Sequence, residues 1–387
     1  MMILDCEPGD GLCCRKLLLS PAEFPKTFKI IEQGILDKVA PGFVVGFWQS
    51  KNTDCIRLCA VGNRSFTPML PILPMLNNTF FDIASLSKVF ATATLTALLV
   101  DRGWLRWNTN VKTIFSNYPY ADVEIRHLLS HTAGMPAHLP WWKHMEKVFY
   151  PTPLYQVSIA DRQALVRKLI LETELIAVPG EKTIYSDLTF MFLGFILEEL
   201  TQMPLDRAIR TFLWEPMGLD APFYHRTVHE PKKLTLSNCA ATYDCFWRGE
   251  VLQGQVHDEN SWAMGGYSGH AGVFARAEDL LCFSKKLMRG FLSPQILRQM
   301  WEPLRYPSDC NRTLGWDMPS GVLASVGKYF SPFTVGHLGF TGCSLWIDTK
   351  KAMAVVLMTN RLAYGLGNEK IKLFRPRFHD ALLEDLA

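Results

Sequence analysis

The chain has no apolar run long enough to cross a bilayer. Among its 387 residues, the longest apolar stretches are 89–100 and 188–197. A membrane-spanning helix needs roughly 20 apolar residues, so both stretches are too short. We expect no membrane span, and we predict that each run forms a helix buried inside a globular protein.

The chain also lacks a large excess of either charge. Lysine and arginine number 40, aspartate and glutamate number 37, and the net charge is +3. A protein that binds nucleic acid usually has a basic face, whereas the basic clusters here are short. Pairs such as Lys232 and Lys233 indicate solvated surface. We therefore expect no nucleic-acid partner.

The first residues lack the pattern of a secretory signal. Residues 1–14 contain Asp5, Glu7 and Asp10 and have no apolar segment behind a basic leader. Ten cysteines are present, but a long chain with 48% hydrophobic residues can bury a core without disulfides. Free thiols are typical of a reducing compartment. We therefore expect a cytoplasmic protein.

Hydrophobic patterning predicts strands near both ends of the chain and helices between them. Strand-like runs occupy 42–49, 56–61, 334–338, 344–348 and 353–358. Helical patterns occupy 24–39, 85–101, 160–175, 188–201, 204–212, 277–288 and 377–386. We therefore predict one sheet assembled from both ends of the chain, with a helical insertion, which is an α/β (α+β) fold.

This pattern divides the chain into an N-terminal extension, 1–23, and a single domain, 24–387. We expect the sheet part to occupy about 24–80 and 310–387, and the mainly helical part about 85–300. Residues 238–268 form a long irregular stretch, and loops of that length inside a compact domain are often functional.

A serine and a lysine three residues apart open the first long apolar helix. On a helix, this spacing places the Ser85 hydroxyl and the Lys88 amine on one face. Burial lowers the pKa of a lysine, so a neutral amine is able to accept the serine proton. The alternative is an N-cap serine beside a surface lysine. The same spacing recurs at Ser325 and Lys328, but Gly327 and the absence of a helical continuation argue against that copy.

Two further segments carry groups that are able to serve a reaction. Tyr185 and Asp187 stand at the start of the predicted helix 188–201, where a capping aspartate beside a packed tyrosine is an equal alternative. The segment 336–342 is a strand edge punctuated by glycines, where a ligand can approach the backbone closely. A β-bulge or tight bend is the alternative there.

Together these segments resemble the S-x-x-K, Y-x-N and K-T-G elements of class C β-lactamases and the related esterases and DD-peptidases. The matching stretches are 81–88, 185–187 and 337–342, the last in the H-x-G form of the wider family. Flanking stretches at 99–115, 127–134 and 269–274 are also similar. The resemblance implies a β-lactamase/transpeptidase-like fold, with an antiparallel sheet flanked by helices, and no cofactor.

The resemblance also implies a role for each residue. Ser85 attacks a carbonyl and becomes acylated, and Lys88 activates it. Tyr185 passes the proton to the leaving group and helps water to attack the acyl-enzyme. The backbone N–H groups of Ser85 and Phe340 form the oxyanion hole, with Gly339 in the same substrate-binding edge.

Two positions depart from the family pattern. Asp187 stands where the β-lactamases have asparagine, and an ionised carboxylate near Lys88 favours the ammonium. Either Asp187 is protonated, or Tyr185 carries more of the base role. His337, which lines the pocket beside Tyr185, replaces a lysine whose fixed charge suits a substrate carboxylate. We therefore expect a small-molecule ester, amide or peptide-like substrate with a less acidic tail, and weaker selection for β-lactams.

Other polar clusters carry less weight. His127 and His131 have a spacing that suits a metal, but no H-E-x-x-H pattern is present, and we predict no metal site. The cluster 256–260 either rims the pocket or braces a loop.

The leading hypothesis is a serine hydrolase that forms an acyl-enzyme on Ser85 and hydrolyses an ester or amide. The alternatives are a penicillin-recognising DD-peptidase or β-lactamase proper, and a non-catalytic binding or scaffold member of the same fold. The intact residues Ser85, Lys88 and Tyr185 argue against the last alternative, although fold does not fix function. The sequence does not indicate an oligomeric state.

Overall fold

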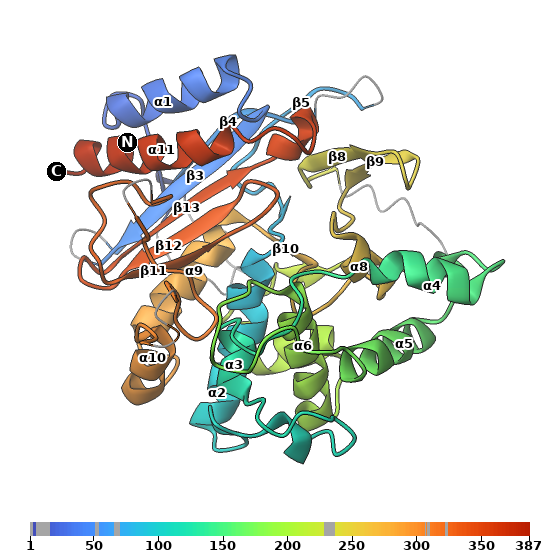
Figure 1. The fold of residues 1–387 in the computed structure, drawn as a ribbon. Helices are drawn as coiled ribbons and strands as arrows, with labels where there is room; N and C mark the ends of the chain where they lie inside the picture. The colour runs from blue at the N-terminus through green and yellow to red at the C-terminus, as the bar shows by residue number, and fades with distance from the viewer. Residues whose placement is uncertain are drawn as a thin grey trace.

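A mixed sheet with helices on both faces forms the upper part of the molecule in Figure 1, and most helices lie below it. The computed structural model describes residues 3–4, 16–50, 54–65, 70–227, 237–305, 307, 310–321 and 324–387. The first and last helices, α1 (Pro25–Leu36) and α11 (Ile371–Asp385), lie side by side on the outer face (Figure 1).

Within the described ranges, eight strands form the main sheet in the order β1-β2-β4-β3-β13-β12-β11, with β5 beside β4. Their bounds are β1 Ile3–Leu4, β2 Lys16–Leu18, β3 Gly42–Gln49, β4 Ile56–Ser65, β5 Leu73–Pro74, β11 Thr334–Leu338, β12 Ser344–Asp348 and β13 Met353–Thr359. Neighbours are antiparallel except β2 and β4. Because β3 pairs with β13, the two ends of the chain meet in the middle of the sheet. This confirms the predicted fold class.

Both faces of the central strands are buried. Phe43, Val45 and Phe47 of β3 pack in one core cluster with α1 and α11. Val44 belongs to the other cluster, together with the helical part of the chain. Successive side chains of a strand point to opposite faces, so burial of both faces produces a continuous apolar run rather than an alternating one.

The remaining helices and short strands lie between the two sheet segments. The helices are α2 Thr94–Asp101, α3 Ile125–Leu129, α4 Trp141–Phe149, α5 Ile159–Leu171, α6 Asp187–Thr201, α7 Leu205–Ile209, α8 Glu259–Ala263, α9 Ala277–Met288 and α10 Pro294–Trp301. The short strands are β6 Phe81–Asp82, β7 Phe223–Tyr224, β8 Ala241–Cys245, β9 Glu250–Gln253 and β10 Val273–Ala275. The stretch 238–268, expected to be irregular, therefore contains the β8–β9 hairpin and α8.

The helix predicted at 85–101 begins one residue later and is not uniform. Helical structure starts at Leu86, passes through a wide π-helical segment at Lys88–Ala93 and continues as α2. Side chains on all sides of this segment are buried, as its apolar composition predicted. π-Helical turns occur frequently at functional sites.

The last helix starts earlier than the sequence predicted. The predicted helix began at Arg377, but α11 begins at Ile371 and includes Pro376. An internal proline removes one helical hydrogen bond. The buried side chains of Ile371 and Phe374 pack in the outer core cluster, and this packing offsets the lost bond.

Strand β2 lies in the stretch predicted as an N-terminal extension, and the division into extension and domain stays a prediction.

No single helix of the described ranges is long and apolar enough to span a membrane. Helix α6 and the helical segment Leu205–Trp214 reach the length and hydropathy of a membrane span only when they are taken together, and the chain bends by 73° between them.

Candidate active site

Ser85 lies in a tight turn between β6 and the buried helix. The Asp82 carboxylate accepts the backbone N–H groups of Ala84 at 2.8 Å and His257 at 2.6 Å. Ala84 has a φ of +47°, which is uncommon for a residue with a side chain, so these contacts hold the turn. The Thr341 hydroxyl donates to the Asp82 carbonyl at 2.7 Å and ties the C-terminal segment to the same turn.

Lys88 lies directly behind Ser85 and is fully buried. Its Nζ donates to Ser85 Oγ at 2.9 Å, to Asp187 Oδ1 at 2.8 Å and to the His270 carbonyl at 3.2 Å. A lysine ammonium has three N–H donors, so these three acceptors use all of them. The contacts around Lys88 therefore fit its charged form.

The charge of Asp187 decides the protonation of Lys88. Burial alone lowers the pKa of Lys88, but Asp187 and Tyr185 together outweigh burial and raise that pKa above its usual value. Burial raises the pKa of Asp187, yet the Lys88 ammonium brings it below the usual range of an aspartate. The structure therefore differs from the expectation of a neutral amine, and it favours an ionised Asp187.

Ser186, rather than Asp187, caps helix α6. The Ser186 hydroxyl accepts the backbone N–H of Thr189 at 3.4 Å. Asp187 is the first residue of the helix, and its carboxylate turns to Lys88 instead. The interpretation of Asp187 as a cap is therefore wrong.

Tyr185 approaches the serine from the other side. Its hydroxyl lies close to both Ser85 and Lys88 and interacts with each. Burial of the hydroxyl end raises the pKa of Tyr185, and the Lys88 ammonium opposes this effect. The residue as a whole is 37% exposed. The Arg312 guanidinium lies 4.9 Å from the ring centroid, and the His131 ring packs at 4.5 Å. Lys88 Nζ lies 5.1 Å from the same centroid, so the cations that border the ring are Lys88 and Arg312.

The end of β11 passes close to the Ser85 turn. A Cβ atom at Gly339 would lie 2.6 Å from the Ile83 carbonyl oxygen, so glycine is needed for this approach. Among the described residues, no hydrogen bond uses the backbone N–H of Ser85 or of Phe340. Both donors therefore remain free for a developing oxyanion.

His337 is neutral and lines the same pocket. Its Nδ1–H donates to the Leu338 carbonyl at 2.8 Å, which leaves Nε2 as an acceptor. Burial lowers the pKa of His337 to about 4. Nε2 is buried and has no hydrogen-bond partner among the described residues. The ring therefore supplies no fixed charge for a substrate carboxylate.

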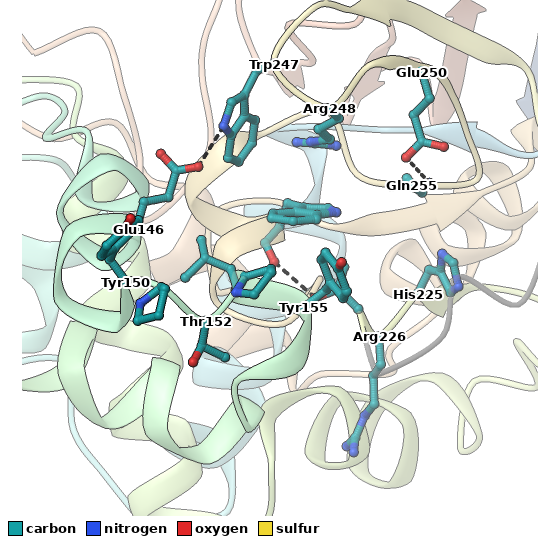
Figure 2. A pocket seen from close by; sticks show the side chains of 15 residues that line it. Glu146, Tyr150, Thr152, Tyr155, His225, Arg226, Trp247, Arg248, Glu250 and Gln255 are labelled. Carbon is teal, nitrogen blue, oxygen red and sulfur yellow. Dashed lines mark hydrogen bonds between the residues drawn. The ribbon is translucent and has the colours of Figure 1, made fainter.

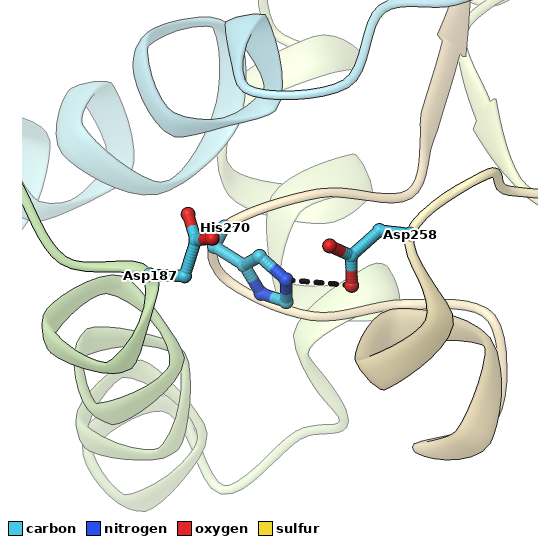
Figure 3. A group of neighbouring side chains, drawn as sticks. All are labelled: Asp187, Asp258 and His270. Atoms are coloured by element: carbon cyan, nitrogen blue, oxygen red, sulfur yellow. Dashed lines mark hydrogen bonds and ion pairs between the residues drawn. The ribbon is translucent and has the colours of Figure 1, made fainter. Parts of the chain in front are cut away.

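A second carboxylate, Asp258, lies near Asp187, with the His270 ring beside both (Figure 3). Asp258 Oδ1 accepts from His270 Nε2 at 2.8 Å and from the Ser261 backbone N–H at 2.7 Å, as the N-cap of α8. Burial raises the pKa of Asp258, but His270 brings it well below the usual value. Asp258 both braces the loop and lines the pocket, so the two interpretations of cluster 256–260 are compatible.

Asp187, Asp258 and His270 also form the one group of described residues whose donor atoms are close enough to share a metal ion, within 4.8 Å of one another. These donors are already engaged, since Asp187 holds the Lys88 ammonium and Asp258 holds His270. A divalent cation here would face the Lys88 charge at short range. The group therefore does not fit a resident metal.

Ser85 opens into a pocket of about 620 Å³. Its wall includes all the predicted site residues except the buried Lys88, and it also includes three arginines that the sequence did not single out: Arg312, Arg361 and Arg375. Arg361 Nε donates to the Phe340 carbonyl at 2.9 Å, and Arg375 donates to the Gly339 carbonyl at 3.2 Å. These contacts hold the strand edge that carries the second oxyanion donor.

A second cavity, of about 580 Å³, borders the loop before α8 and has aromatic walls (Figure 2). The Arg248 guanidinium packs on the rings of Trp247 and Trp262, 5.2 and 5.0 Å from their centroids. It also donates to the carbonyls of Val256 and His257. The Arg248 contacts support the loop. The cavity lining includes no predicted catalytic residue, so the pocket at Ser85 is the candidate active site.

The other sequence candidates lie outside the pocket. The second S-x-x-K copy forms a turn, where the Lys328 backbone N–H donates to Asp380 and the Ser325 carbonyl accepts from His379. His131 Nδ1 accepts the Ser186 backbone N–H at 3.1 Å, so it positions the start of α6 instead of binding a metal.

Known proteins share this architecture. The family profile of β-lactamases matches residues 38–372. A protein of Salmonella agona (strain SL483), provisionally named a D-alanyl-D-alanine carboxypeptidase, is 32% identical over 333 residues, which span 78% of this chain and 73% of that protein. The chain belongs to the β-lactamase family and is a serine hydrolase.

Two solved structures have the same fold at low sequence identity. EstCE1, a hydrolase with promiscuous acyltransferase activity, has a TM-score of 0.70 and 21% identity, covering 94% of this chain and 100% of that chain. A D-amino acid amidase from Ochrobactrum anthropi SV3, complexed with L-phenylalanine amide, has a TM-score of 0.69 and 19% identity, covering 95% and 100%. Both confirm the β-lactamase-like fold.

Proposed function

We propose that Ser85 is the nucleophile of this hydrolase and that its substrate is a small ester or amide. The observation that carries the proposal is the position of Lys88 Nζ, which contacts both Ser85 Oγ and Asp187 Oδ1. Further support comes from the pocket at Ser85, whose lining includes Phe340, and from the backbone N–H groups of these two residues, which have no hydrogen-bond partner among the described residues.

The hydrogen bonds around Ser85 indicate the path of its proton. Lys88 donates to Ser85 Oγ, so the serine proton points to the other partner, the Tyr185 oxygen. Tyr185 then accepts this proton as Ser85 attacks, and the Lys88 charge opposes the effect of burial on the pKa of Tyr185 and so favours its phenolate. Lys88 acts as a fixed cation rather than as a proton acceptor.

The two chemical steps follow from these positions. Ser85 Oγ bonds to the carbonyl carbon, and the oxyanion accepts from the N–H groups of Ser85 and Phe340. Tyr185 passes the serine proton to the leaving oxygen or nitrogen as its bond to carbon breaks. Water then gives a proton to Tyr185 and attacks the acyl group, the bond to Ser85 Oγ breaks, and Tyr185 passes the proton to Ser85 as the acid leaves.

The first experiment compares the wild type with Ser85→Ala. We expect the purified wild type to hydrolyse p-nitrophenyl butyrate and the variant to lose at least 1,000-fold of the rate, since nucleophile loss typically costs more than this. Equal rates in both proteins overturn the proposal. A matched control is Ser325→Ala, the serine of the second S-x-x-K copy, which lies outside the pocket.

A D-alanyl-D-alanine carboxypeptidase is a second candidate, favoured by the name of the Salmonella relative. It predicts release of D-alanine from diacetyl-L-lysyl-D-alanyl-D-alanine by the wild type and not by Ser85→Ala. The neutral His337 weighs against tight binding of the terminal carboxylate of that peptide.

We also propose a reducing compartment, the cytoplasm, for this protein. Five buried cysteines support this proposal because they carry free thiols: Cys59, Cys239, Cys245, Cys310 and Cys343. The test is to fuse the protein to a fluorescent reporter and to measure the reporter in cell fractions. Recovery of the fusion outside the cytoplasmic fraction overturns this proposal.

A further inference from the structure

The pocket beside Ser85 has a wall with two carboxylate oxygens that the protein leaves free. Asp187 Oδ1 accepts from Lys88, whereas Oδ2 has, among the residues that the structure describes, only His138 Nδ1 nearby, at 3.9 Å. Asp258 Oδ1 accepts from His270 and Ser261, and within the described ranges no hydrogen bond reaches Oδ2. The two side chains are 21% and 22% exposed, so a ligand in the pocket can reach both.

These free groups are all acceptors. Lys88 and the engaged histidine lower the pKa values of Asp187 and Asp258, so both carboxylates are ionised near neutral pH. Elsewhere on the wall, the free Nε2 of His337 is also an acceptor. Lys88 has no donor left for a ligand. A ligand group that satisfies this wall must bring N–H donors and a positive charge, which describes an ammonium group.

The acidic wall stands close to the atom that Ser85 attacks. Asp187 Oδ1 and Ser85 Oγ touch the same nitrogen of Lys88, at 2.8 and 2.9 Å. A group that faces Asp187 therefore lies near the reacting carbonyl, and we assign it to the acyl part of the substrate. In an aminoacyl group, the ammonium is attached to the carbon next to that carbonyl.

We propose that this active site selects aminoacyl esters or amides with an unblocked ammonium group, which lies between Asp187 and Asp258 and donates to their free oxygens. The protein then removes an N-terminal residue. The inference rests on the proposed function, because it names the substrate class of the Ser85 site. A blocking acetyl group would remove the charge and turn a carbonyl oxygen toward two carboxylates, which disfavours blocked substrates.

The chemistry balances without a further reactant. Ser85 Oγ bonds to the aminoacyl carbon, the bond to the leaving amine or alcohol breaks, and Tyr185 passes the serine proton to that group. Water then cleaves the aminoacyl ester and yields the free amino acid. The ammonium of the substrate takes no part in proton transfer.

The test compares free and blocked substrates of one amino acid. We would measure kcat/KM for D- and L-alanine p-nitroanilide and for their N-acetyl derivatives. We expect the wild type to prefer the free amine of at least one enantiomer by tenfold or more. Equal or greater kcat/KM for the acetylated forms overturns the inference, and so does the absence of hydrolysis of all four anilides.

Asp258→Asn tests the wall itself. Asparagine is as good an N-cap as aspartate and still accepts from Ser261 and His270, so we expect α8 to remain folded. The preference for the free amine should fall at least fivefold. Glu172→Gln removes the same charge from an exposed helix end and should keep the preference unchanged. A preference unchanged in Asp258→Asn overturns the inference.

The pH dependence gives a second readout. An α-amino group loses its proton near pH 8, so kcat/KM for the free anilide should fall above about pH 8, while the acetylated one should not follow. Hydrolysis of p-nitrophenyl butyrate separates the two proposals. If p-nitrophenyl butyrate is hydrolysed by the wild type but not by Ser85→Ala, and the N-acetyl anilides are preferred over the free ones, the amine inference fails and the hydrolase proposal stands. If Ser85→Ala retains every activity, the proposed function itself fails.

Discussion

Asp187 Oδ1 and Lys88 Nζ form an ion pair of 2.8 Å behind the candidate nucleophile, at the position where the related β-lactamases carry an asparagine. The lysine side chain of this pair is completely buried. A charged partner in place of a neutral amide fixes Lys88 as an ammonium, and it leaves Tyr185 as the group that exchanges protons.

Asp187→Asn should change the pH–rate profile. Without the carboxylate, the strongest group that opposes the effect of burial is lost, so the pKa of Lys88 falls. Lys88 then loses its proton at a lower pH, and the alkaline limb of kcat/KM for p-nitrophenyl butyrate should move down by at least one pH unit. If both limbs keep their positions, Asp187 has no electrostatic role.

Tyr185→Phe should abolish most activity with little effect on stability. The change removes the hydroxyl that contacts Ser85 and Lys88, and a general base contributes about 10²- to 10⁴-fold to a rate. We expect kcat to fall by at least 100-fold in single-turnover measurements. The midpoint of thermal unfolding should change little, since Tyr185 is partly exposed. A loss below tenfold would contradict the assignment of Tyr185 as base.

Gly339→Ala should damage the oxyanion hole. The new Cβ atom would lie 2.6 Å from the Ile83 carbonyl, so the strand edge and the Phe340 N–H must move away from Ser85. Loss of one oxyanion donor lowers kcat by about 10²- to 10³-fold. Gly367→Ala is the matched control, because a Cβ atom there meets nothing within 4 Å. Similar kcat values for both variants would argue against a role of Phe340.

His337→Lys should shift selectivity toward substrates with a carboxylate. His337 is neutral because burial lowers its pKa to about 4, whereas a lysine brings a charge into the pocket. We expect the wild type to hydrolyse p-nitrophenyl butyrate faster than benzylpenicillin, and the variant to raise the relative rate for the penicillin. A wild type that turns over penicillin faster than the ester contradicts this expectation.

Asp82→Asn should remove a pH-dependent part of the stability. Burial raises the pKa of Asp82 from 3.8 to about 6, so its protonated form is favoured in the folded protein. The associated stability is fully present below pH 3.8 and is lost as the pH rises through about 6. The free energy of unfolding of the wild type, relative to the variant, should therefore fall between pH 4 and 7, by up to about 3 kcal/mol. Urea titrations of both proteins at about pH 4 and about pH 7 measure this difference. If the free energies of unfolding of the wild type and the variant change equally between the two pH values, the raised pKa is contradicted.

Local patterns predicted most elements of the fold. Helix α9 and strands β11 and β12 have the bounds that periodicity indicated, because their packing follows the local pattern. The start of α11 was wrong, since packing of residues far apart in the sequence outweighs the local effect of Pro376.

The candidate site was predictable where it depends on short motifs. Ser85, Tyr185, His337 and Phe340 all line one pocket, as the family resemblance implied. Arg312 and the contact of His270 with Asp258 were not predicted, and Asp258 itself was named only as a member of cluster 256–260, because these contacts follow no short pattern. The role of Asp187 depends on one distance, and only a three-dimensional structure supplies it.

The junction between Asp82 and Thr341 joins residues 259 positions apart in the sequence. During synthesis, the ribosome delivers the segment with Ser85 and Lys88 long before the strand that carries the second oxyanion donor. The nucleophile therefore exists for most of translation beside half an active site. Hydrolytic activity therefore requires that the last strands have joined the sheet. A nascent or truncated chain that ends before Phe340 contains Ser85 but lacks the second oxyanion donor.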